Sequence, residues 1–165
     1  MTPQIFTIQS SVGTAPYSSG NAIKVFTEWF EGKDTVSHLT RGLNLDVIKN
    51  QDANGNIKLP KGVWKFQLEF DMSPKTILGV KYVVYRPNLS IFLNNLPLTM
   101  RLPKYQYWGG IYPFSYPPII FQVEINQDDT LFRIEIAPDY LENGSPKTDI
   151  LLIGNVVFRG EKIAD

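Results

Sequence analysis

The sequence predicts an all-β fold, built as an antiparallel sandwich of two sheets. Three observations predict it. Apolar and polar residues alternate with a period of two wherever the chain is apolar, turn residues separate these short segments, and no window keeps a helical apolar stripe over three turns. The chain has 165 residues, of which 43% are hydrophobic and 19% charged. This length and composition indicate a single folded domain with a substantial core.

Each apolar segment fits a strand whose alternate residues face a core. In residues 66–72, phenylalanine, leucine and methionine alternate with Gln67, Glu69 and Asp71, as in a strand with one solvated face. A short segment at 139–142 is the exception, and there we expect one helical turn. The expected strands are 5–8, 23–30, 43–48, 66–72, 80–85, 89–93, 121–126 and 132–136.

Turn residues divide the chain between these segments. Asn54-Gly55 is a tight-turn signal, and similar polar pairs occur at 94–95 and 128–129. Short strands with turns at this spacing are typical of a sandwich or jelly roll. Because residues 9–21 are rich in Ser, Gly, Thr and Pro, we expect residues 1–21 to form an irregular N-terminal arm or the first strand, followed by a single domain over 22–165.

Residues 103–118 combine six aromatic side chains with glycine and proline. The segment is too rich in proline for a central strand and too aromatic for an ordinary solvated loop. It fits a cap over one end of the sandwich, a subunit contact, or a platform on which sugar faces stack. The candidate ligand-binding or partner-binding residues are Tyr105, Tyr107, Trp108, Tyr112, Phe114 and Tyr116.

The segment at 150–158 is apolar at both parities, so a strand here hides both of its faces. One face meets the core, and the other meets a neighbouring subunit or a covering loop. The candidate interface residues are Leu152, Val156 and Phe158. Such a strand suits a closed cyclic oligomer.

Charge and composition narrow the classes of partner. Sixteen basic residues balance sixteen acidic ones, which gives no bias toward nucleic acid or an anionic membrane. No apolar run approaches the roughly 20 residues of a membrane helix, and no signal peptide is visible at the N-terminus. The absence of cysteine excludes disulfides, thiolate catalysis and cysteine-based zinc sites. We therefore expect no nucleic-acid partner and no membrane insertion.

Candidate catalytic residues are few. The single histidine, His38, lies beside Ser37 and Thr40, which leaves a hydrolase triad as an alternative, but no nucleophile elbow accompanies it. Glu69 and Asp71 could mimic a carboxylate pair, although alternating charges on a solvated sheet face are far commoner. We expect no catalytic residue.

The best metal candidate is the spacing Asp52-x-Asn54-x-Asn56, which resembles the start of a calcium loop. Gly55 lies inside this triplet, and Val63 stands where the bidentate Glu is needed. A hairpin turn explains the same residues. We expect neither a metal nor a cofactor.

Four short segments occur in an order that belongs to a known family. They are the entry into an aromatic strand at 56–66, a strand and polar turn at 90–98, a turn and strand at 128–134, and a glycine-containing terminal strand at 152–158. In this order they resemble the jelly-roll domain of tumour-necrosis-factor ligands and complement-type globular heads, over residues 43–163. Lys61, Asp128 and the insertion at 103–118 depart from the family pattern. The resemblance implies a jelly roll and a homotrimer.

The resemblance also implies a class of function. Jelly rolls that begin directly at Met and lack cysteine look like virus or bacteriophage virion components. We therefore expect a non-enzymatic virion structural protein, a homotrimer that acts as capsid decoration, vertex or head-fibre component, contacts major capsid or other virion proteins, and is made in the host cytoplasm without secretion. The alternative is a carbohydrate-binding module that holds a host-surface glycan on the aromatic segment.

Overall fold

The structure is a computed structural model in which every described element is a strand, as the all-β prediction requires. The residues that it describes are 4–10, 15–16, 23–24, 36–41, 56–74, 83–85, 88–102, 105–107, 114–137, 140–142, 145–147 and 151–165.

The largest sheet has seven strands and forms one layer of the sandwich. Its strands are β1 (Ile5–Ser10), β2 (Ala15–Pro16), β4 (Val36–Arg41), β6 (Gly62–Pro74), β11 (Phe114–Ser115), β12 (Ile119–Ile125) and β16 (Leu151–Ala164). The long strands β6 and β16 pair along the middle, β1 and β4 follow beyond β16, and β12 and β11 pair in turn with the other edge of β6.

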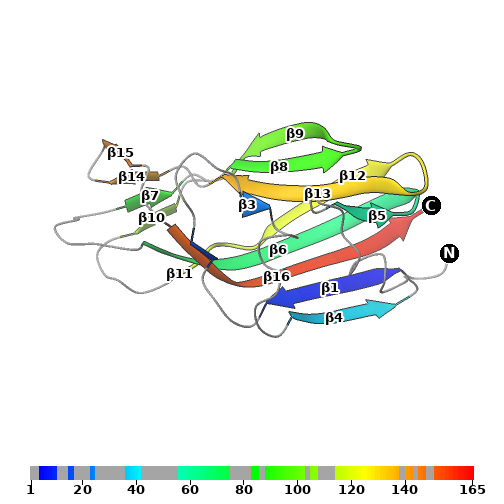
Figure 1. Cartoon of the computed structure of the whole chain (residues 1–165), viewed down its shortest axis with the longest axis horizontal. Coiled ribbons are helices and arrows are strands. Elements are labelled where there is room, and N and C mark those ends of the chain that lie inside the picture. Colours follow the sequence, from blue (N-terminus) through cyan, green and yellow to red (C-terminus); the bar gives the residue numbers. More distant parts are fainter. Residues whose placement is uncertain are drawn as a thin grey trace.

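A five-stranded sheet forms the second layer. Its strands are β3 (Ile23–Lys24), β5 (Ile57–Leu59), β8 (Asn88–Leu93), β9 (Leu96–Arg101) and β13 (Thr130–Ala137). Here β13 pairs with β8, β8 forms a hairpin with β9, and β3 and β5 share the other edge of β13. Together the two layers give the predicted antiparallel jelly-roll sandwich (Figure 1).

A small four-stranded sheet lies at one end of the long axis (Figure 1). It contains β7 (Val83–Tyr85), β10 (Tyr105–Tyr107), β14 (Tyr140–Glu142) and β15 (Ser145–Lys147). The helical turn expected at 139–142 is wrong, because the backbone of β14 pairs with β7 on one side and β15 on the other. Among the other expected strands, 43–48 lies outside the described residues, and only Ile23–Lys24 is described in 23–30.

Aromatic rings contributed by both layers fill the core. The ring of Phe66 stacks on Phe132 from the second layer at a centroid distance of 4.7 Å, and on Phe158 at 5.5 Å. Phe121 lies 5.2 Å from the same ring. Offset or tilted ring pairs at these distances contribute beyond the burial of their area. Among the described residues, the large side chains of Phe6, Ile57, Leu59 and Trp64 are also fully buried.

The close packing of these rings depends on a glycine in β16. Gly160 pairs with Phe6 on one side and Phe66 on the other. A Cβ built on Gly160 would lie 2.3 Å from Cε1 of Phe6 and 3.0 Å from Cε1 of Phe66. The absence of a side chain therefore creates the space that both rings occupy.

Gly160→Ala is expected to lower the free energy of unfolding by about 1–3 kcal/mol, because a methyl group there overpacks the core. Urea unfolding measures the change. In a Phe6→Leu background, which lacks the two nearest ring atoms, the same substitution should cost less. Equal costs in both backgrounds would contradict the assigned contact.

Candidate interaction surfaces

The hairpin of β8 and β9 lies at one edge of the second layer and closes on a two-residue turn. Asn94 and Asn95 have φ values of 47° and 64°, which asparagine tolerates better than most residues, and Leu93 and Leu96 close the turn as a pair. The side chain of Asn94 accepts a hydrogen bond from the backbone N–H of Leu131 at 3.0 Å, and the Asn94 N–H donates to the Leu131 carbonyl at 2.8 Å. The turn predicted at 94–95 is confirmed, and it is tied to β13.

A single arginine of β13, Arg133, fixes the same hairpin through several contacts. The guanidinium of Arg133 lies 3.8 Å from the ring centroid of Phe92, and its Nη1 donates to Oδ1 of Asn95 at 2.6 Å and of Asn56 at 3.2 Å. Its Nε donates to Glu135 at 3.2 Å. Charge-assisted hydrogen bonds of this kind are about twice as strong as neutral ones. The hairpin is therefore held in one orientation.

Strand β9 exposes an apolar face on this fixed hairpin. Leu96 and Leu98 are 73% and 63% exposed. Leu98 pairs with Ile91, which is buried, so the two leucines lie on the side of the sheet that elsewhere faces the core. Pro97 lies between the two leucines and stands opposite Phe92, in the pair next to the turn-closing pair. In this position its backbone nitrogen points away from β8. Because proline has no N–H, it cannot donate a hydrogen bond to a strand added at this edge. The exposed leucines had not been singled out in the sequence.

The aromatic segment at 103–118 divides between two sheets. Tyr105–Tyr107 form β10 at the edge of the small sheet, and Phe114–Ser115 form β11, paired with Met72 and Asp71 of β6. Both strands lie toward the same end of the molecule (Figure 1). Trp108 and Tyr112 lie outside the described residues, as do the side chains of Tyr105, Tyr107 and Phe114. A stacking platform of Tyr105, Tyr107, Trp108 and Tyr112 stays a prediction, and so does a binding role for Phe114.

Tyr116, the last of the candidate ligand-binding or partner-binding residues, is only 4% exposed. Its ring stacks on Phe70 at 5.3 Å with an interplanar angle of 1°, and its N–H donates to the Phe70 carbonyl at 3.0 Å. Burial raises the pKa of the Tyr116 hydroxyl above its usual value of 10.0. Tyr116 therefore packs within the protomer and anchors the end of the aromatic segment to β6.

The three predicted interface residues all lie in β16. Phe158 is fully buried among Phe6, Phe66 and Phe132, and so packs in the core of its own chain. The side chains of Leu152 and Val156 lie outside the described residues, and an interface there stays a prediction.

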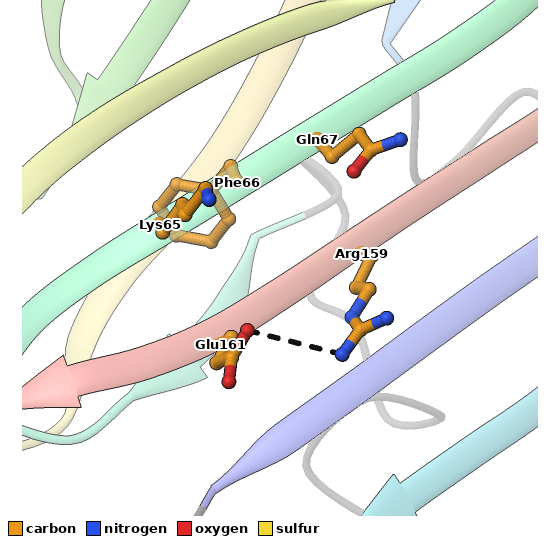
Figure 2. A pocket seen from close by; sticks show the side chains of 5 residues that line it. All are labelled: Lys65, Phe66, Gln67, Arg159 and Glu161. Atoms are coloured by element: carbon orange, nitrogen blue, oxygen red, sulfur yellow. Dashed lines mark ion pairs between the residues drawn. The ribbon is translucent and has the colours of Figure 1, made fainter.

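The outer face of the seven-stranded sheet is polar and bears a shallow hollow between β6 and β16. Lys65 and Gln67 line it from β6, and Arg159 and Glu161 line it from β16, as Figure 2 shows. Its volume is about 170 Å³, and Phe66 also lines it. Arg159 and Glu161 form an ion pair at 3.8 Å.

The carboxylates considered for catalysis hydrogen-bond to neighbouring side chains. Glu69 accepts from Nε2 of Gln67 at 3.3 Å, and Asp71 accepts from the hydroxyl of Ser115 at 2.7 Å. His38 lies in β4 opposite Ile8, and its side chain lies outside the described residues. Residues 51–55 are not described either, whereas Asn56 is buried beside Arg133. No group of three metal-binding side chains occurs in the described ranges.

In the part of the chain that the structure describes, no helix has the length and apolar character needed to cross a membrane.

Comparison with known proteins identifies the fold. No family model matches the chain, and no curated protein matches its sequence. Among solved structures, the chain is similar to Eiger TNF from S. frugiperda, with 9% identity, a TM-score of 0.53, and coverage of 99% of this chain and 94% of that chain. A structure of the infectious bursal disease virus Gx strain is more distant, with 7% identity, a TM-score of 0.41, and coverage of 97% and 56%.

The likeness to Eiger TNF confirms a tumour-necrosis-factor-like jelly roll. At 9% identity it defines the fold alone, and the lower TM-score of the viral structure supports no inference. The function must therefore be argued from the surfaces of this chain.

The buried Tyr116 predicts a pH dependence of stability. Its pKa is raised in the folded state, so its contribution is complete below pH 10.0 and is lost as the pH rises through the folded-state value. The free energy of unfolding should fall more steeply from about pH 9 to about pH 11 in the unmodified chain than in Tyr116→Phe. Parallel pH profiles in denaturant titrations would show that Tyr116 does not carry this dependence.

Proposed function

We propose that this chain is a non-enzymatic structural protein of a virion, which assembles as a homotrimer and serves as a capsid decoration, vertex or head-fibre component. The proposal rests on the apolar face of β9, where the side chains of Leu96 and Leu98 are mostly exposed to solvent. Covering apolar surface gains about 25 cal/mol per Å². Exposed apolar groups on a rigid element are typical of contact surfaces.

A second copy of the chain is the proposed occupant of this face. Pro97 opposes pairing at the sheet edge, so a partner packs against the leucine side chains rather than extending the sheet. The surrounding turn is polar, with Asn94 and Asn95 exposed, which matches an apolar interface centre within a hydrophilic rim. A specific contact needs about 800 Å² per partner, so the leucines form the centre of a larger surface.

The virion role has support from the fold class and from the balance of charge. Jelly-roll sandwiches recur in viral capsid and lectin domains. A neutral chain suits assembly through apolar contacts rather than through electrostatic attraction to nucleic acid. In this proposal the aromatic segment at 103–118 contacts major capsid or other virion proteins, and the assembled protein is found in the virion.

The assembly is tested by light scattering on the size-exclusion peak, with a double variant that removes the apolar face. The unmodified protein should have a mass of three times 18.8 kDa. Leu96→Ser combined with Leu98→Ser should give monomers, because two hydroxyl groups are then desolvated in the contact.

The matched control is Ile120→Ser, which changes an apolar side chain 57% exposed on β12 and should leave the trimer intact. A monomeric unmodified protein would contradict the proposal. So would a folded double variant that keeps the mass of three chains.

A further inference from the structure

We propose that the hollow between β6 and β16 binds a saccharide unit that carries a carboxylate group. This inference is independent of the oligomeric state, because every lining residue comes from one chain. The site also differs from the aromatic segment at 103–118, since its residues come from β6 and β16 (Figure 2).

The register of two strands creates the hollow. Lys65 stands opposite Glu161, and Gln67 stands opposite Arg159. Between these pairs, Phe66 stands opposite Gly160. Because side chains alternate between the two faces of a sheet, the ring of Phe66 enters the core, and Gly160 has no side chain. Four long polar side chains therefore surround a floor made mainly of backbone.

Two cations in this hollow can bind a carboxylate. Arg159 pairs with Glu161 at 3.8 Å, and these side chains are 51% and 42% exposed. An ion pair this long and this exposed contributes little, so the guanidinium can turn to a better acceptor. Lys65 is exposed and has no hydrogen-bond or ion-pair partner among the described residues. Lys65 and Arg159 lie diagonally across the two strands, so a carboxylate between them would meet a planar guanidinium on one side and an ammonium group on the other.

The remaining lining residues point to a sugar rather than to a simple anion. Glu161 and Gln67 place acceptor oxygens beside the cations, and a site built for an anion alone gains nothing from a carboxylate. Sugar hydroxyl groups both donate and accept, so they can use all four side chains. Ile120, exposed on β12 opposite Gln67, offers an apolar flank for the C–H face of a sugar ring.

The test is a titration of the isotope-labelled protein with glucuronic acid, followed by amide chemical shifts. Saturable shifts are expected at 65–67 and 159–161. Glucose, which lacks the carboxylate, and acetate, which lacks the hydroxyl groups, should each bind about tenfold more weakly or worse. Arg159→Gln and Lys65→Gln should each weaken glucuronic acid binding about tenfold. The matched control is Lys58→Gln on β5, an exposed lysine of the other sheet, which should leave binding unchanged.

Glu161→Gln distinguishes the roles assigned to the lining residues. It removes a repelling charge but keeps an acceptor oxygen, so glucuronic acid should bind more tightly. The proposal is overturned if glucuronic acid causes no saturable shift, if acetate binds equally well, or if Arg159→Gln has no effect. Because the shifts report on residues within one chain, such a failure would leave the proposed trimer unaffected, and a monomeric mass would leave this result unaffected.

Discussion

The stacking of Phe66 against Phe132 and Phe158 is the contact on which the rest of the structure depends. It joins a central strand of one layer to a central strand of the other, with ring centroids 4.7 and 5.5 Å apart. The rings fit because Gly160 leaves room beside them. Once these residues face inward, alternation places Lys65 and Arg159 on the outer face. The core packing and the polar hollow thus follow from one register.

In the second layer, contacts within the chain likewise fix the position of an exposed surface. Arg133 lies over Phe92 and hydrogen-bonds to Asn95, which fixes the β8–β9 hairpin to β13. The leucines of β9 are held on this support with their apolar side uncovered. A preorganised surface loses little conformational entropy on association.

The alternation of apolar and polar residues within a single segment predicted the strands that bury one of their faces. The alternation in 66–72, 121–126 and 132–136 matches β6, β12 and β13. Strand β4 is not among the expected strands, because its apolar residues Val36 and Leu39 do not alternate with a period of two. The brief Tyr-Leu-Glu segment of β14 suggested a helical turn, because three residues carry too little periodicity to separate the two states.

The candidate surfaces were less predictable, because exposure depends on distant strands. Leu96 and Leu98 alternate as core residues do, and only the extent of the opposite layer determines that they remain in water. Tyr116 belongs to an aromatic segment that suggested a binding platform, yet the neighbouring Phe70 buries it. The hollow between β6 and β16 required the pairing register, which no single segment contains.

The proposed assembly is tested most directly by the solvent accessibility of the β9 leucines in the assembled protein. A soluble paramagnetic agent broadens methyl resonances that water can reach, with the buried Leu89 and the exposed Ile163 as references. Leu96 and Leu98 should resist broadening as Leu89 does, although each is mostly exposed in a single chain. Broadening equal to that of Ile163 would show that nothing covers the β9 face and would contradict the proposed assembly.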